Sequence, residues 1–224
     1  MIKSSTKSPG GSELFYRSIR AVLFITYKCL FSFRYYGADK VPPPDGRGVI
    51  LAPNHASYLD PPLLGISLKR RVTYLAKEYL FQHSFVGWVL RSIGAFPIKT
   101  KTDDFRSIRD LIRILESGHC VTVFPEGTRS ENGQMKEPES GIGFLAMKSK
   151  AYVVPVYIEG SYDAFPKDAK KIKRHPIKVY FGDAFIPAED ESLKTAPEPY
   201  LAVSQKIMQE IKELKDSAIS RQGS

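Results

Sequence analysis

The chain of 224 residues is 42% hydrophobic and carries 33 Lys and Arg against 24 Asp and Glu, a formal net charge of +9. Its length suits one α/β domain with a substantial core, and its composition excludes a disordered protein. The positive charge predicts an acidic partner such as anionic lipid, nucleic acid or an acidic carrier protein, while two cysteines are too few for a disulfide framework and favour a reducing compartment.

The N-terminal part of the chain divides into a tail and an apolar segment. Residues 1–13 are rich in Ser, Lys and Gly and are expected to form a flexible tail. Residues 14–40 contain many large apolar side chains, but basic residues interrupt them: Arg17, Arg20, Lys28 and Arg34. A membrane-spanning helix needs about 20 apolar residues, so this segment is expected not to cross a bilayer. It is expected to form a helix, lying either in a membrane interface or on the domain's own core.

Short apolar, β-branched runs alternate with helical patterns in the domain predicted for residues 41–224. The runs predict buried strands at residues 49–52, 72–76, 95–98, 120–124, 152–158 and 177–181. The clearest helices are predicted at 103–117 and 199–217. Strands alternating with helices predict an α/β fold with a single sheet, largely parallel or mixed, flanked by helices and with functional loops at its carboxyl edge.

The first candidate loop, residues 54–62, follows the first predicted strand. Asp60 precedes Pro61, so Asp60 is expected at a helix N-cap with Pro61 in the first helical position. The turn between His55 and Asp60 can bring the carboxylate back to the imidazole, where it would fix the tautomer and support a protonated ring. Ser57 suits a turn or capping role better than that of a nucleophile.

The second candidate loop, residues 124–130, directly follows the strand predicted at 120–124. Gly127 permits close approach of the backbone, Thr128 offers a hydroxyl, and Arg129 offers a planar fork matched to phosphate. The pattern alone is also that of a tight turn with solvated charge. A loop that carries Glu126, Thr128 and Arg129 together nevertheless suits a phosphorylated polyol.

These two loops together resemble the glycerolipid acyltransferase family. The family signature N-H-x-S-x-x-D is filled by Asn54, His55, Ser57 and Asp60, and residues 124–130 match the block F-P-E-G-T-R-S at every position. A weaker third block lies at residues 153–156. The resemblance covers residues 48–161, in the expected order and spacing, and is much more specific than a single glycine pattern.

The resemblance implies a one-step transfer with no covalent acyl-enzyme, metal or cofactor. His55, oriented by Asp60, would deprotonate the sn-2 hydroxyl of lysophosphatidic acid (1-acylglycerol 3-phosphate), which then attacks the thioester of acyl-CoA or acyl-carrier protein. Backbone amides near the first loop are expected to stabilise the oxyanion. The glycerol phosphate would be held by Glu126, Gly127, Thr128 and Arg129. Such an enzyme of phospholipid synthesis is expected to be peripheral or monotopic on the cytoplasmic face of a membrane, in contact with anionic lipid.

One position departs from the family pattern. Thr100 stands where the family commonly has a phosphate-binding arginine, and Lys99 or Lys101 is expected to supply the charge instead. A lysine is a point charge rather than a bidentate fork. Another lyso-lipid headgroup therefore remains an alternative acceptor.

Other interpretations differ in the class of protein. Water in place of the lipid hydroxyl would make a thioesterase-like hydrolase, and a chain without catalysis would be a basic module that binds membrane surfaces. The basic run at residues 167–174 suits an anionic membrane, an acidic carrier or a solvated face. No recognised nucleic-acid-binding motif accompanies the basic residues, so no nucleic-acid partner is expected.

Overall fold

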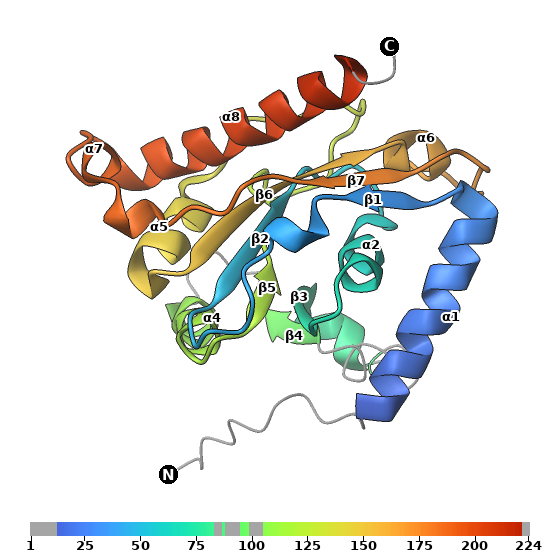
Figure 1. Ribbon diagram of the computed structural model, residues 1–224, viewed down its shortest axis with the longest axis horizontal. Coiled ribbons are helices and arrows are strands. Elements are labelled where there is room, and N and C mark those ends of the chain that lie inside the picture. The colour runs from blue at the N-terminus through green and yellow to red at the C-terminus, as the bar shows by residue number, and fades with distance from the viewer. Residues whose placement is uncertain (1–12, 83–86, 88–94, 99–104, 221–224) are drawn as a thin grey trace.

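A seven-stranded sheet with the order β1-β7-β6-β2-β5-β3-β4 forms the centre of the computed structural model, which describes residues 13–82, 87, 95–98 and 105–220 (Figure 1). The neighbouring strands are parallel except β6 and β7, which are antiparallel. The prediction of a largely parallel or mixed sheet is therefore confirmed. The strands are β1 (Arg34–Tyr36), β2 (Val49–Pro53), β3 (Val72–Lys77), β4 (Ala95–Ile98), β5 (Cys120–Thr122), β6 (Tyr152–Glu159) and β7 (Lys178–Phe181).

Helices cover both faces of this sheet (Figure 1). On one face lie α1 (Glu13–Phe31) and α2 (Asp60–Ser67), and on the other lie α4 (Phe105–Glu116), α5 (Ser140–Ser149) and α8 (Pro199–Ser220). The shorter helical elements are η1 (Ala38–Lys40), η2 (Glu78–Gln82), α6 (Ser161–Ala164), η3 (Pro187–Glu189) and α7 (Glu191–Lys194).

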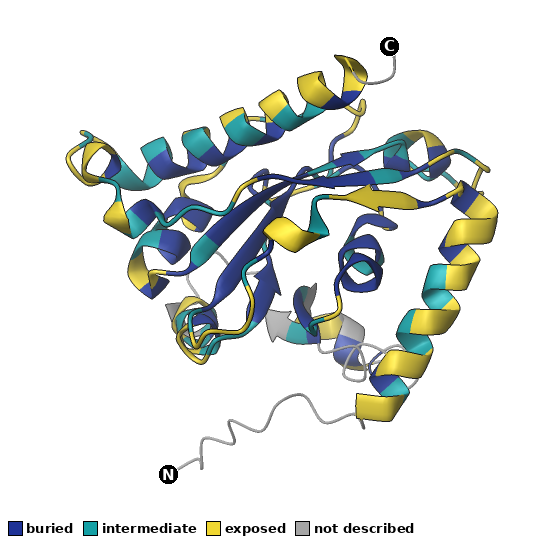
Figure 2. Ribbon diagram, viewed as in Figure 1, coloured by how far each residue is buried: buried dark blue, intermediate teal, exposed yellow. Residues whose placement is uncertain are grey.

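Strand β2 is buried on both of its faces (Figure 2). Val49 and Leu51 join the core cluster on the side of α1 and α2, whereas Ile50 and Ala52 join the cluster on the side of α4, α5 and α8. A strand covered by helices on both sides needs apolar residues at every position, because successive side chains point to opposite faces. This explains the uninterrupted apolar run from which the strand was predicted.

The predicted N-terminal segment 14–40 is helical only in its first part. Helix α1 ends at Phe31, and Ser32 then takes a left-handed conformation with φ 47°. The following residues, Arg34–Tyr36, form β1, which pairs in parallel with β7 at the edge of the sheet. The apolar composition of this segment therefore combines a helix with an edge strand that the sequence pattern did not distinguish.

Helix α1 buries one side and exposes the other (Figure 2). Tyr27 and Phe31 belong to the core on the α2 side of the sheet, together with Phe33 just beyond the helix. The opposite side exposes Leu14, Val22 and Ile25 to solvent. Packing on the domain is thus established for one side of the helix only. In the described part of the chain, no helix is long and apolar enough to span a membrane.

Candidate active site

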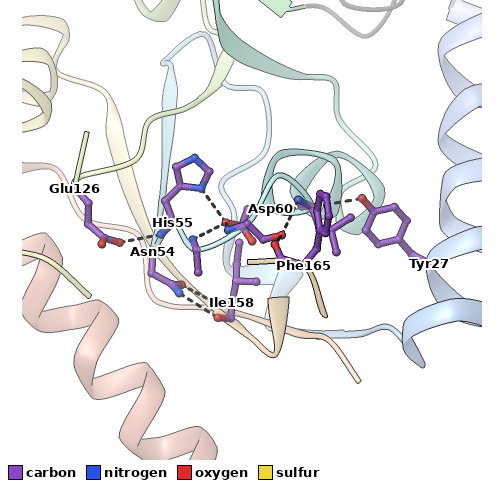
Figure 3. Close-up of polar contacts among 10 residues, drawn as sticks. Tyr27, Asn54, His55, Asp60, Glu126, Ile158 and Phe165 are labelled. Atoms are coloured by element: carbon purple, nitrogen blue, oxygen red, sulfur yellow. Dashed lines mark hydrogen bonds and ion pairs between the residues drawn. The ribbon is translucent and has the colours of Figure 1, made fainter. Parts of the chain in front are cut away.

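The two predicted loops meet at the carboxyl edge of the sheet (Figure 3). They follow β2 and β5, which are hydrogen-bonded neighbours. The backbone N–H of His55 donates to Glu126 Oε1 at 2.8 Å, and the backbone N–H of Ser130 donates to the carbonyl of His55 at 2.7 Å. The sheet order therefore joins the two loops into a single site.

His55 and Asp60 form a hydrogen-bonded pair. The distance from His55 Nδ1 to Asp60 Oδ2 is 2.8 Å, and the Asp60 side chain is fully buried while that of His55 is 16% exposed. A carboxylate only accepts hydrogen bonds, so Nδ1 carries the proton and Nε2 is left to accept one. The imidazole also stacks on Phe124, with ring centroids 3.7 Å apart and planes inclined by 19°. The carboxylate and the aromatic ring together fix the orientation of the imidazole.

Asp60 is not the N-cap that its position before Pro61 suggested. The N-cap of α2 is Leu59, which makes no capping bond through its side chain, and Asp60 is the first helical residue. The Asp60 carboxylate folds back over the loop instead, and Oδ2 also accepts hydrogen bonds from the backbone N–H groups of Ala56 and Ser57, each at 2.8 Å. Asp60 therefore fixes the conformation of the loop and also places a negative charge beside His55.

Ser57 has the turn role that the sequence favoured. Its hydroxyl is buried, donates to the carbonyl of Phe165 at 2.6 Å and accepts from the backbone N–H of Leu59 at 3.1 Å. A hydroxyl held in this way stabilises the loop and its contact with the segment after α6.

Four backbone N–H groups of the first loop already have partners within the protein. The backbone N–H groups of His55, Ala56 and Ser57 all donate to carboxylates, and the N–H of Asp60 donates to the carbonyl of Ser57 at 3.3 Å. Amides already bonded to carboxylates are not available to a substrate oxyanion. These donors stabilise the loop itself, and the expectation that other backbone amides near it stabilise the oxyanion stays a prediction.

Glu126 connects the two loops from a buried position. Its Oε1 accepts the N–H of His55, and its Oε2 accepts the N–H of Lys136 at 2.9 Å. Burial raises the pKa of the Glu126 carboxyl, and the two amide hydrogen bonds partly oppose this shift. Both carboxylate oxygens thus accept hydrogen bonds from the protein backbone, and Glu126 holds the first loop against the second.

Gly127 and Thr128 form an exposed tight turn after Glu126. Gly127 has φ +66°, a left-handed conformation that favours glycine, and a Cβ atom there would lie 2.8 Å from a carboxylate oxygen of Glu139. The N–H of Gly127 donates to the carbonyl of Phe124 at 3.1 Å. The turn requires glycine for its conformation and leaves the Thr128 side chain at the surface.

Arg129 lies over the ring of Tyr58, a contact that the sequence did not reveal. The guanidinium carbon is 3.5 Å from the ring centroid, and Tyr58 is 60% exposed. Arg129 Nη1 is buried and has no hydrogen-bond partner among the described residues. Tyr58 occupies a variable position of the signature, so no spacing rule marks it. The stack therefore holds the guanidinium against the first loop and leaves Nη1 without a hydrogen-bond partner among the described residues.

Asn54 anchors the first loop to β6. Its side-chain amide donates to the carbonyl of Ile158 at 3.1 Å, and its Oδ1 accepts the N–H of Ile158 at 2.7 Å. The signature asparagine is therefore buried and attaches the first loop to β6, a contact that the sequence did not predict. The predicted contribution of Lys99, and the departure at Thr100, lie outside the described residues.

These features define an α/β enzyme in which a histidine, oriented by a buried carboxylate, can act as a base next to an arginine that can bind an anion. Among the described residues, no group of three or more His, Cys, Asp or Glu side chains could hold a metal ion.

The chain belongs to the acyltransferase family, whose model, described as Acyltransferase, matches residues 32–159. A 1-acyl-sn-glycerol-3-phosphate acyltransferase of Bacillus subtilis is 31% identical over 176 residues, which cover 77% of this chain and 84% of the relative. A protein of the same name from Streptococcus pneumoniae is 26% identical over 219 residues, which cover 94% of this chain and 79% of the relative.

The fold also matches a solved structure. The crystal structure of the 1-acyl-sn-glycerophosphate (LPA) acyltransferase PlsC from Thermotoga maritima superposes with a TM-score of 0.73 at 25% identity, covering 89% of this chain and 79% of the other. The resemblance inferred from the two loops is confirmed, and the chain is an acyltransferase.

Proposed function

We propose that the protein transfers a fatty acyl group from acyl-CoA or acyl-carrier protein to the sn-2 hydroxyl of 1-acylglycerol 3-phosphate. The product is phosphatidic acid, an intermediate of phospholipid synthesis. The observation that carries this proposal is the His55–Asp60 pair at 2.8 Å, joined through the backbone to the loop that presents Arg129. The names of the relatives in Bacillus subtilis and Streptococcus pneumoniae support the same acceptor.

The chemistry assigned to His55 is general base catalysis. Nε2 takes the proton of the sn-2 hydroxyl as the oxygen attacks the thioester carbonyl. The tetrahedral intermediate then collapses, the C–S bond breaks, and the leaving thiolate takes the proton from the imidazolium. Asp60 is hydrogen-bonded at 2.8 Å and stabilises the imidazolium while it exists. No side chain of the protein becomes acylated in this scheme.

Acceptor recognition is assigned to the second loop. Arg129 offers a fixed planar cation with a buried, unpartnered Nη1, and a phosphate monoester can accept two parallel hydrogen bonds from such a group. Gly127 and Thr128 lie beside it at the surface. We assign Lys99 as a second cation for the same phosphate. Glu126 is assigned a supporting contribution through the loop, because its oxygens accept backbone N–H groups.

A lipid acceptor implies that the enzyme works at a membrane. We propose peripheral or monotopic binding to the cytoplasmic face of an anionic membrane. The exposed side of α1 supports this, because Leu14, Val22 and Ile25 face solvent on a helix that also carries basic residues. Apolar side chains of this kind enter the interface while lysine and arginine reach the headgroups.

The experiment is an acceptor panel read by mass spectrometry. Purified protein receives labelled acyl-CoA or labelled acyl-carrier protein, together with lysophosphatidic acid or lyso-lipids of other headgroups. Phosphatidic acid is expected from lysophosphatidic acid, with little product from the others. A preferred product with another headgroup would overturn the assigned acceptor, and release of free fatty acid at the same rate without any acceptor would make the protein a thioesterase.

A further inference from the structure

The loop of residues 165–177, between α6 and β7, presents a cluster of cations to solvent. We call it the basic loop. Its exposed cations are Lys170, Lys171, Lys173 and Arg174, and Asp168 is the one carboxylate of the loop. Ile172 lies in the middle of these cations and is 55% exposed. The sequence thus places a large apolar side chain in water, between basic neighbours on both sides.

Backbone contacts hold the basic loop in place. The N–H of Lys173 donates to the carbonyl of Ala164 at 2.8 Å, and the N–H of Ile177 donates to the carbonyl of Phe31 at 2.9 Å. The second bond attaches the loop to the end of α1, beside which α6 lies in Figure 1. These bonds therefore hold the basic loop in place next to the N-terminal helix.

The first residue of the basic loop, Phe165, contacts the loop of residues 54–62, which carries His55 and Asp60 and which we call the catalytic loop. The hydroxyl of Ser57 donates to the carbonyl of Phe165 at 2.6 Å, and the rings of Phe165 and Tyr58 lie 6.2 Å apart between centroids (Figure 3 shows the Phe165 contact). The ring of Tyr58 in turn stacks against the guanidinium of Arg129. A surface that bound the basic loop would therefore lie close to the loop of residues 54–62 and to Arg129.

The charge of the loop is largely uncompensated within the protein. Lys167 pairs with Glu131 at 3.4 Å. Among the described residues, none of the cations that flank Ile172 makes a salt bridge. Cations that compensate no internal carboxylate favour an external anionic surface, and each lysine or arginine near an anionic bilayer contributes on the order of 1 kcal/mol. An exposed isoleucine among them adds an apolar contact for the lipid interface.

We propose that the basic loop is a membrane contact, with Lys170, Lys171, Lys173 and Arg174 on anionic headgroups and Ile172 entering the acyl boundary. The inference rests on the proposed function, because a lipid acceptor brings the site to the bilayer. With the exposed side of α1 as the first contact, the loop supplies a second one next to the catalytic loop. Two contacts fix the orientation of the site towards the membrane.

The electrostatic part is tested with vesicle sedimentation of the full chain. The variant Lys170→Gln/Lys171→Gln is compared with Lys150→Gln/Lys212→Gln, which removes the same charge from exposed positions at the end of α5 and on α8. Vesicles contain phosphatidylcholine alone or with phosphatidylglycerol. The loop variant is expected to bind the anionic vesicles on the order of tenfold more weakly, with the matched control unchanged. The difference is expected to shrink in 1 M salt, where the Debye length is about 3 Å.

The apolar part is tested with Ile172→Ser against Ile219→Ser, since Ile219 is equally exposed, at 57%, near the end of α8. Removing an isoleucine side chain that enters the lipid is expected to weaken binding to both vesicle types by roughly fivefold or more, with little dependence on salt. The control is expected to bind as the wild type does. Equal binding of all variants would overturn the inference, as would equal weakening of loop variants and controls.

A detergent assay separates this inference from the proposed function. With acceptor dispersed in detergent micelles, the loop variants are expected to keep the wild-type kcat and the wild-type KM for the acyl donor. A raised donor KM with unchanged vesicle binding would overturn the inference and assign the loop to the donor. Failure of the wild type to form phosphatidic acid would reject the proposed function alone, because sedimentation measures the membrane contact without catalysis.

Discussion

Asp60 supports the imidazole of His55 and the loop around it with the same oxygen. Oδ2 accepts from His55 Nδ1 and from two backbone N–H groups, while Oδ1 has no partner among the described residues. In Asp60→Asn the amide oxygen can take the place of Oδ2, so the three contacts are retained and the charge is lost. We expect kcat to fall by about 10²- to 10⁴-fold with only a small change in melting temperature.

The matched comparison is Asp60→Ala, which removes the side-chain oxygen that accepts these hydrogen bonds. The N–H groups of Ala56 and Ser57 would then be left unpaired in a buried place, at a cost of about 1–3 kcal/mol each in the free energy of unfolding. Chemical denaturation and steady-state kinetics of both variants separate the two contributions. Normal turnover of Asp60→Asn would show that the negative charge is not needed.

The stack of Arg129 on Tyr58 predicts a separable effect on acceptor binding. Tyr58→Phe keeps an aromatic face under the guanidinium, whereas Tyr58→Leu removes it, and a cation–π contact of this kind is worth about 0.5–2 kcal/mol. We expect Tyr58→Leu to raise the KM for lysophosphatidic acid several-fold, with unchanged donor KM, and Tyr58→Phe to behave nearly as the wild type. Kinetics with each substrate varied in turn checks this. Equal losses for both substrates would contradict it.

Among single residues, the sequence predicted the contact between His55 and Asp60 but not the contacts that hold the two loops together. The pairing of His55 with Asp60 could be predicted because their side-chain chemistry and local spacing favour it, and the structure shows the contact at 2.8 Å. The hydrogen bond from His55 to Glu126 joins residues 71 positions apart, and the contact of Arg129 with Tyr58 likewise crosses from one loop to the other. Such contacts depend on which strands are neighbours, and no local pattern contains that information.

Helix α1 has one side that packs on the domain and one side that faces solvent. Its buried side packs on the domain through Tyr27 and Phe31, and its outer side exposes Val22 and Ile25. We expect Phe31→Ala to lower the free energy of unfolding by about 3–5 kcal/mol, because it leaves a cavity in the core. The double variant Val22→Ser/Ile25→Ser is expected to keep its stability and to lose affinity for vesicles.

Thermal melts and vesicle sedimentation of these two variants provide the measurement. Both residues of the double variant are exposed, so a loss of stability comparable with that of Phe31→Ala would contradict the two-sided assignment of α1. Unchanged vesicle affinity in a folded double variant would assign the membrane contact to the basic loop alone.

The predicted and unpredicted elements differ in the strength of their local pattern. The strands β2 and β6 are apolar and β-branched runs that are buried on both faces, so their composition identifies them. By contrast, β1 is three exposed residues, Arg34–Tyr36, and becomes a strand only by pairing with β7. Helix α5 contains two glycines and is largely apolar, so it shows no amphipathic period. Tertiary pairing and packing determine these two elements.

For the whole molecule, the order of the strands creates the site. Strand β2 lies between β5 and β6, so the loops after β2 and β5 meet at one edge while Asn54 fastens the first of them to β6. Parallel strands place their carboxyl ends at the same edge, which is where α/β folds bind ligands. The alternation of strands and helices predicted the class of fold, but the strand order required the structure.

His55 is the group that we propose to activate the hydroxyl of lysophosphatidic acid for attack on an acyl thioester. The most direct measurement is the rate of phosphatidic acid formation by purified wild type and His55→Ala at saturating substrates, with folding checked by thermal melts. We expect His55→Ala to stay folded, because the backbone N–H groups at positions 55, 56 and 57 keep their carboxylate partners. We expect its rate to fall by about 10²- to 10⁴-fold. Wild-type turnover in a folded His55→Ala protein would rule out His55 as the general base.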